Sequence, residues 1–300
     1  MIFKTFFIMK IFTRLTIVLL VTIVLFSCET KDYTLWQLDT VTPAQANLYV
    51  MRTPNNKTIV IDGGWKQDAP YMKGFLAALG NHVDMWIISH PHLDHVNALT
   101  EILKQPDGLT IDQILVSFPT VEWIKKYEKK HEADIVRFHD AINKSGKEFT
   151  QVELGDVFEI DNIVIEVLGT MNPEITSPNA INNSCMVFKM NLPNTSLLFL
   201  GDLGLEGGEK LLTGAFSSKL PSDYVQMAHH GQQGVSEAVY QAINPKFCLW
   251  PTPDWLWDND KGEGKNSGPW KTLEVREWMD KLDVQKHYVM KDGLHKIKLR

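Results

Sequence analysis

Short apolar stretches of strand length alternate with turn residues along most of the chain. Those of the first half are rich in β-branched and aromatic residues and occupy positions 35–38, 46–51, 58–61, 83–88 and 111–118. The second half repeats the pattern at 150–154, 157–160, 163–168, 184–190 and 196–200. Helical periodicity appears between them, at 69–79, 96–104 and 121–144. Strands in runs on either side of a helical segment predict an α/β fold in which two mixed β-sheets pack face to face with helices outside, a four-layer αββα sandwich.

The longest predicted helix, 121–144, carries two histidines. His131 falls on its apolar stripe and His139 does not. Neither has ligand-type neighbours in the sequence, so we expect both to be packed or solvated rather than metal-binding. The lysine pairs of this helix alternate with glutamates, which is typical of a solvated face.

The N-terminal stretch 15–26 is almost wholly apolar and follows two basic residues. It is too short for a permanent membrane helix, which needs about 20 residues, and it has the layout of a signal peptide. Its Leu-x-Ser-Cys ending resembles a lipobox, in which Cys28 is lipidated. We therefore predict a lipoprotein signal peptide at 1–27, a tether at 28–33, and a location in the bacterial cell envelope, on the periplasmic side or the outer surface. An ordinary secretion signal and an anchor helix are the alternatives.

The remaining chain, 34–300, reads as one domain, because no low-complexity linker or repeated unit divides it. The 44% hydrophobic content of the full 300-residue sequence suffices for a sizeable core, and its formal net charge of −6 gives no general attraction to nucleic acid. A nucleic-acid partner is therefore not favoured, although a local basic patch would permit one. Cys185 and Cys248 lie in apolar stretches and are expected to be buried free thiols, with pairing in an oxidising compartment as the alternative.

Three imidazoles and a carboxylate follow the strand at 83–88 within six positions: His90, His92, Asp94 and His95. A strand-to-helix loop of this kind presents side chains at the end of a sheet. His90 and His92 can point the same way from an extended loop, while Asp94 and His95 can face a second ion. Such a cluster favours divalent metal.

Other predicted strands are also followed by residues of the types that bind metals. Asp202 follows the strand at 196–200, and His229 and His230 follow an apolar stretch at 225–228. Asp62 ends the strand at 58–61 and is expected to orient the histidine loop rather than to bind metal. These loops converge only if the sheets place the strand ends at one edge.

Together these residues resemble the metallo-β-lactamase fold superfamily, whose signature His-x-His-x-Asp-His is matched in full by residues 90–95. Within the superfamily, residues 183–184, 201–202 and 229–231 resemble the ComEC branch most, and phosphorylcholine esterases are also similar. Most superfamily hydrolases have a further histidine before the bridging aspartate, and here the segment Asn183-Ser184 takes its place.

The resemblance implies a binuclear centre with a shared water or hydroxide. One ion would be bound by His90, His92 and Asp202, and the other by Asp94, His95, His230 and the same Asp202. The ligands suit zinc, and manganese or iron as well. Asp62, Asn183 and Ser184 would support the ligands. Asp94 and Asp202 would serve catalysis, with His229 as a proton donor or charge stabiliser, or else as a structural histidine.

The implied function is hydrolysis of a phosphodiester or phosphate ester, small or polymeric. A lactone, lactam or thioester hydrolase is the second enzyme interpretation, and a surface lipoprotein that only binds a ligand is the third. The tryptophan-rich segment 250–257 is expected to pack within the C-terminal part of the domain. Alternatively, its aromatic faces stack on bases or cage a quaternary ammonium, and the nearby Asp254, Asp258 and Asp260 favour the cation.

Overall fold

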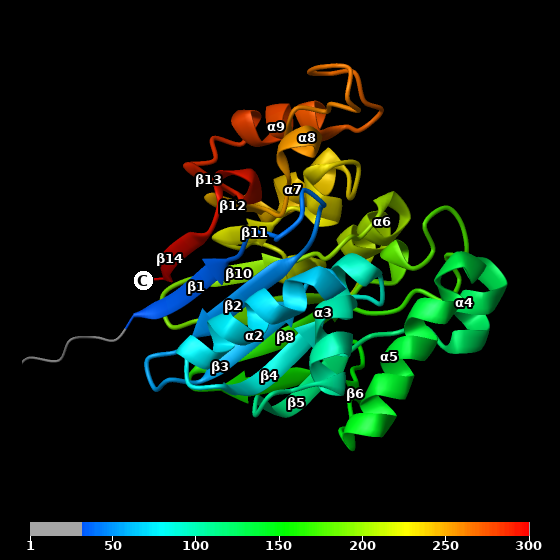
Figure 1. Ribbon diagram of the computed structural model, residues 1–300. Helices are drawn as coiled ribbons and strands as arrows, with labels where there is room; N and C mark the ends of the chain where they lie inside the picture. Colours follow the sequence, from blue (N-terminus) through cyan, green and yellow to red (C-terminus); the bar gives the residue numbers. More distant parts are fainter. Residues whose placement is uncertain (1–31, 300) are drawn as a thin grey trace, which may run out of the picture. The chain divides into compact units, whose positions relative to one another are not determined.

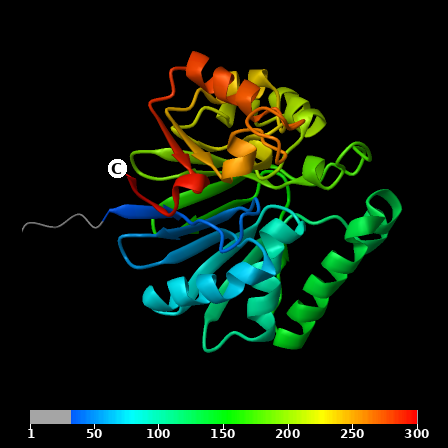
Figure 2. The ribbon, with the colours of Figure 1, turned by 45° about the horizontal axis from the view of Figure 1, so that its top comes forward.

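Two seven-stranded mixed sheets lie face to face between layers of helices in the computed structural model, which describes residues 32–299 (Figures 1 and 2). This is the four-layer arrangement that the sequence predicts. The predicted signal peptide and Cys28 lie outside the described residues. Among the residues that are described, no helix has the length and apolarity needed to cross a membrane.

The first sheet combines antiparallel pairing around β1–β3 with parallel pairing from β3 to β6. Its spatial order is β14 (His295–Leu299), β1 (Tyr33–Gln37), β2 (Leu48–Arg52), β3 (Thr58–Asp62), β4 (His82–Ile88), β5 (Thr110–Val116) and β6 (Thr150–Gln151). Figure 1 shows the last strand, β14, beside the first, β1. The C-terminal strand thus completes the sheet that the N-terminal strands begin.

The second sheet is parallel from β10 to β13 and antiparallel from β7 to β10. Its spatial order is β13 (Lys286–Val289), β12 (Phe247–Trp250), β11 (Tyr224–Gln226), β10 (Ser196–Phe199), β9 (Val187–Asn191), β8 (Ile163–Gly169) and β7 (Val157–Ile160).

Helices cover the outer face of each sheet (Figure 2). Those of the first half are α2 (Ala69–Ala78), α3 (Leu93–Lys104), α4 (Val121–Tyr127) and α5 (Glu132–Ser145). Those of the second half are α6 (Leu205–Thr213), α7 (Glu237–Ile243), α8 (Asp254–Trp257) and α9 (Thr272–Lys281). Short 3-10 helices are η1 (Lys66–Asp68), η2 (Lys129–His131), η3 (Asn182–Ser184), η4 (Ser217–Lys219), η5 (Ala228–Gly231) and η6 (Met290–Asp292).

Both faces of the central strands are buried. Successive side chains of a strand point to opposite sides, so each of these strands contributes to two cores. In β3, Ile59 and Ile61 enter the core between the sheets, whereas Val60 enters the core under the helices of the first half. In β10, Phe199 joins the core between the sheets and Leu198 joins the core under the helices of the second half. Three cores therefore separate the four layers.

Two predicted helices differ from those observed. The predicted helix 121–144 is broken into α4, η2 and α5, because Glu128 leaves the helical region with φ −139° and ψ 52°. Its carboxylate accepts the Ile181 backbone N–H, a tertiary contact that helical periodicity does not encode. The helix predicted at 96–104 begins earlier, at Leu93, so Asp94 and His95 lie in its first turn rather than on a loop.

The parallel strands bring the chemistry-bearing residues to one place. Asp62 ends β3, the histidine cluster follows β4, Asp202 follows β10, and His230 follows β11. The carboxyl ends of parallel strands are where α/β sheets place their ligand sites. Strand ends from both sheets meet here.

Candidate metal centre

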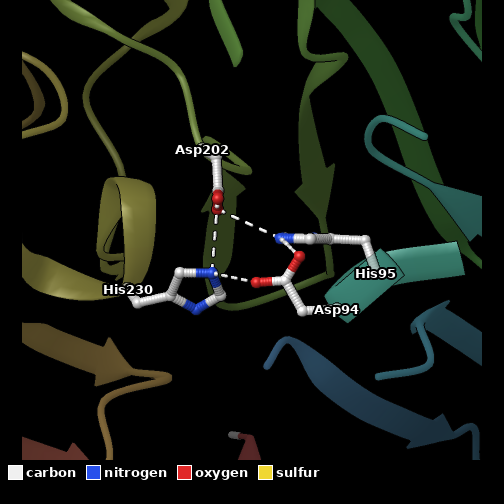
Figure 3. Close-up of side chains that lie close together, drawn as sticks. All are labelled: Asp94, His95, Asp202 and His230. Carbon is white, nitrogen blue, oxygen red and sulfur yellow. Dashed lines mark ion pairs between the residues drawn. The ribbon is translucent and has the colours of Figure 1, made fainter. Parts of the chain in front are cut away.

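Four side chains converge from three separate segments in Figure 3: Asp94, His95, Asp202 and His230. One donor atom from each lies within 4.8 Å of the others. A second group, His90, His92 and Asp202, meets the same criterion. Asp202 belongs to both groups, so the structure brings together all six predicted ligands as two sets that share one carboxylate.

The distances within the sets suit a small ion. Nε2 of His230 lies 3.1 Å from Asp94 Oδ2 and 3.2 Å from Asp202 Oδ2, and Nε2 of His95 lies 3.2 Å from Asp202 Oδ1. In the other set, His90 Nε2 lies 3.0 Å from His92 Nδ1 and 3.9 Å from Asp202 Oδ2. Donor atoms bound about 2.1 Å from a tetrahedral zinc ion are about 3.4 Å apart.

Several atoms at the centre are buried without a hydrogen bond among the described residues. They include Nε2 of His95, Nε2 of His230 and Oδ1 of Asp202. Buried polar atoms are normally satisfied, and atoms that are not require an explanation such as an ion. The donor set and its unsatisfied atoms therefore fit two divalent cations.

The charges of the metal-free cluster are strongly coupled. Burial opposes ionisation of Asp202, but the His230 and His95 imidazoles outweigh it and hold the pKa of Asp202 well below its usual range. Burial likewise disfavours the imidazolium of His230, yet the Asp202 and Asp94 carboxylates raise the pKa of His230 to about 9. Burial and the adjacent His131 lower the pKa of His92 to about 3. The carboxylates therefore favour the protonated form of His230, whereas His92 stays neutral.

Asp62 orients the histidine loop as the sequence predicts. Its Oδ1 accepts the Ser89 N–H (2.7 Å), and its Oδ2 lies 2.8 Å from His95 Nδ1 and accepts from Asn47 Nδ2 (2.7 Å). A bond from His95 Nδ1–H to this carboxylate leaves Nε2 free for metal. Asp62 itself lies in the left-handed region with φ 55°.

The two adjacent histidines project from a strained turn. His229 and His230 have φ 50° and 57°, which costs about 1–3 kcal/mol per residue for non-glycine side chains. His230 Nδ1 lies 3.2 Å from the Pro251 carbonyl, which turns Nε2 toward Asp94 and Asp202. At Gly231, φ is 79° and a Cβ atom would lie 2.4 Å from the Trp250 ring, so only glycine fits.

His229 lies beside the ligands but takes part in neither set. Its Nε2 is 3.9 Å from Asp202 Oδ2 and 3.3 Å from Asn182 Nδ2, and its Nδ1 is 3.1 Å from the Gln233 carbonyl. Its side chain remains partly exposed and lines the cavity over the site. Of the two adjacent histidines, His229 is therefore the one that lines the cavity.

The supporting residues Asn183 and Ser184 lie differently from the prediction. Asn183 Oδ1 accepts the Gly207 N–H at the start of α6, and Ser184 Oγ accepts the Asn172 N–H. Their neighbours face the centre instead, because three residues per turn place Asn182 and Cys185 on the same side of η3. Asn182 contacts His229, and Cys185 Sγ accepts the Asp202 N–H at 3.2 Å. Cys185 and Cys248 are both buried free thiols, as predicted.

His131 packs in the structure, as expected, but its packing partner is a predicted metal ligand. Its ring lies 4.3 Å from that of His92, and His92, Glu128 and His131 form a third group of possible ligands. The break at Glu128 produces this arrangement by turning η2 toward the site. His139 fulfils the expectation, since it packs against Phe149. The apolar stripe distinguishes the two histidines in the sequence, but no local pattern encodes the helix break that brings His131 to His92.

A cavity of about 430 Å³ opens over the ligands. Asp94, Asp202, His92 and His229 line its floor, and the other lining residues are Ala44, Gln45, Trp65, Leu93, Glu128, Lys130, His131, Asn179, Asn182 and Trp255. Within the tryptophan-rich segment, Trp250 is fully buried in the core, as ordinary packing predicts, whereas Trp255 faces the cavity. The volume suits a small-molecule ligand.

Comparisons with known proteins agree with this geometry. The family model described as "Metallo-beta-lactamase superfamily" matches residues 41–246, which include all six ligands. ComE operon protein 3 of Bacillus subtilis (strain 168) is 28% identical over 179 residues, which are 58% of this chain and 21% of that protein. The matched residues therefore span about a fifth of that relative's length.

Solved structures show the same fold. YhfI of Bacillus subtilis, a metallo-β-lactamase fold protein, superposes with a TM-score of 0.54 at 13% identity, covering 89% of this chain and 100% of YhfI. CmlA, a diiron β-hydroxylase from Streptomyces venezuelae, gives a TM-score of 0.55 at 12% identity, covering 90% of this chain and 54% of CmlA. The family match and the two ligand sets support a metal-dependent hydrolase with a binuclear centre.

Proposed function

We propose that this chain, which belongs to the metallo-β-lactamase superfamily, is a two-metal hydrolase that cleaves a phosphodiester or phosphate ester. The observation that carries the proposal is the carboxylate of Asp202, which joins two complete ligand sets under an open cavity. A chain that had kept only the fold for ligand binding would not need both sets intact. We propose zinc as the metal, because imidazole and carboxylate donors suit it.

Different residues of the chain have different roles in the proposed reaction. His90, His92 and Asp202 would hold one ion, and Asp94, His95, His230 and Asp202 the other. Two such ions, when bound, polarise a phosphoryl oxygen and lower the pKa of water. Asp62 fixes the tautomer of His95, and the Pro251 carbonyl does the same for His230.

His229 is the proposed proton donor to the leaving oxygen. It lines the cavity next to Asp202, and the Gln233 carbonyl and Asn182 hold its ring in place. A positioned imidazole of this kind contributes about 10²–10⁴-fold to a rate. Lys130, on the cavity rim, supplies the positive charge that an anionic phosphate ester requires.

The test is hydrolysis by the purified, zinc-loaded protein. Bis(p-nitrophenyl) phosphate, p-nitrophenyl-phosphorylcholine, DNA and nitrocefin would be compared, with Asp202→Ala as the inactive reference. We expect turnover of at least one phosphate ester that Asp202→Ala abolishes. Turnover of nitrocefin alone would instead support a lactam hydrolase, and a fully metal-loaded protein without any turnover would support a binding function.

We also propose that Cys28 is lipidated and anchors the protein in the cell envelope. This proposal rests on the N-terminal sequence, in which basic residues are followed by an apolar stretch and then by Leu-x-Ser-Cys. The Cys28→Ser variant should leave the membrane fraction when cells are fractionated. If that variant sediments with membranes as the unchanged protein does, the anchor is of another kind.

A further inference from the structure

Two tryptophans line the cavity, and one loop holds both of them. Trp65 Nε1 donates a hydrogen bond to the Gln45 carbonyl (2.7 Å), and Trp255 Nε1 donates one to the Pro43 carbonyl (2.8 Å). Residues two apart in an extended chain are separated by at most about 7 Å, so the two indoles are anchored close together. The Gln45 side chain also contacts Asp94 Oδ2 at 3.3 Å, which ties the loop to the metal ligands.

The hydrogen bonds to the loop determine which part of each tryptophan can contact a ligand. The indole N–H is the only polar group of a tryptophan side chain, and both N–H groups are already used by the loop. Only the aromatic surface of the two rings is left to contact a ligand. The ring of Trp255 packs against Trp270, with ring centroids 4.8 Å apart in an edge-to-face contact.

The Glu128 carboxylate lines the cavity, but it accepts the Ile181 N–H and lies 3.8 Å from His131 Nε2. The other charges around the tryptophans favour a neutral ring over a cation. The sequence suggested that Asp254, Asp258 and Asp260 assist a cationic head group. In the structure, Asp258 pairs with Lys265 at 3.4 Å, and Asp260 accepts hydrogen bonds from backbone N–H groups of its own loop. Asp254 lines a different cavity, of about 210 Å³. None of the three lines the cavity over the metal ligands.

Among residues 32–299, one lysine, Lys130, lines the same cavity, and no arginine does so. Lys130 is exposed and has no ion pair among the residues that the structure describes. An ammonium group without a carboxylate partner, beside a candidate two-metal centre, suits an anionic group of a ligand. The cavity thus combines metal ligands, one cation and an aromatic wall.

We infer that the cavity selects a phosphate ester bearing a flat, neutral aromatic ring, such as a nucleobase. The ring stacks on Trp65 and Trp255, and Lys130 faces a non-bridging phosphate oxygen. This inference rests on the proposed function, since it names the substrate class of the same site. Stacking alone does not read a base sequence, so the site would accept different bases.

Calorimetric titration of the zinc-loaded protein with two probes tests the inference without measuring turnover. Adenosine 5′-monophosphate and ribose 5-phosphate share the phosphate and the sugar and differ in the ring. We expect adenosine 5′-monophosphate to bind at least about tenfold more tightly, as one stacked base allows. Trp65→Leu and Trp255→Leu, which keep apolar bulk but remove the ring, should each reduce this ratio by about fivefold.

Two further variants separate stacking from charge and from general damage. Lys130→Met should weaken both probes equally and leave the ratio unchanged. Trp36→Ala removes a tryptophan that packs on Phe75 away from the cavity, and should change neither affinity.

Equal affinities for the two probes, no binding of either, or an undiminished ratio in both leucine variants would overturn the inference. Tighter binding of phosphorylcholine than of adenosine 5′-monophosphate would also overturn it, because the site would then prefer a cationic group to an aromatic ring. The proposed function fails differently, through absence of phosphate ester hydrolysis, so the two failures are distinguishable.

Discussion

Asp62 Oδ2 lies 2.8 Å from His95 Nδ1, and both side chains are completely buried. The same oxygen also accepts hydrogen bonds from Ser89 Oγ and Asn47 Nδ2. An asparagine at this position has only one acceptor oxygen, so it cannot serve both these three donors and the Ser89 N–H that Asp62 Oδ1 accepts. The tautomer of His95, and with it the orientation of a metal-binding nitrogen, therefore depends on the charge of residue 62.

Asp62→Asn should weaken zinc binding by about 10–100-fold, the usual cost of losing such an outer partner. Asparagine tolerates the positive φ of this position, so the fold should persist. The affinity is measured by competition with a chromogenic chelator. Asp84→Asn is the matched control, because Asp84 is also buried and accepts the Thr58 N–H but lies outside the ligand sets. Equal zinc affinity in the two variants would contradict the role of Asp62.

His131→Ala should lower the affinity for one zinc ion only. The His131 ring packs on His92, which forms one ligand set with His90 and Asp202. Removing the His131 ring should therefore lower the zinc affinity of that set by about 3–10-fold. Stepwise titration with zinc and a competing chelator resolves the two ions. His139→Ala, on α5, offers the comparison, since His139 packs against Phe138 and Phe149 instead. An effect of the same size in both variants would show that helix packing alone is responsible.

Zinc binding should release protons at pH 7. Burial disfavours the imidazolium of His230, but the Asp202 and Asp94 carboxylates raise its pKa to about 9, and the pKa of His95 is also raised. Both rings are thus protonated in the metal-free protein at pH 7, and zinc must displace these protons from Nε2. Apparent affinity should therefore rise as pH increases toward 9, by up to about 100-fold per pH unit for two protons. Calorimetry in buffers of different ionisation enthalpy counts them, and a count of zero would refute this description.

Gly231→Ala should destabilise the fold by about 2–5 kcal/mol and reduce bound zinc. The φ of 79° strains any side chain, and the added Cβ would meet the Trp250 ring at 2.4 Å. Gly146→Ala has a similar φ of 67° but nothing within 4 Å of the new Cβ, so it should cost only about 1 kcal/mol. Urea unfolding with metal analysis measures both. Similar losses in the two variants would mean that backbone strain, not the contact with Trp250, matters.

The sequence alone predicted the four-layer fold and, through its resemblance to the metallo-β-lactamase superfamily, the six residues of the two ligand sets. Strand length, apolar alternation and polar residues at strand ends are local signals, and the parallel strands of one sheet bring their carboxyl ends to the same edge. The same logic placed Asp62 beside the histidine loop. These features depend on backbone geometry that short stretches of sequence encode.

Tertiary structure alone decided which neighbours act on the centre. The break at Glu128 turns His131 toward His92, and one turn of 3-10 helix directs Asn182 rather than Asn183 to the site. Trp255 faces the cavity whereas Trp250, five residues earlier, is core. A rotation or a helix break is fixed by contacts between residues far apart in the chain, such as Glu128 with Ile181, and no local pattern carries that information.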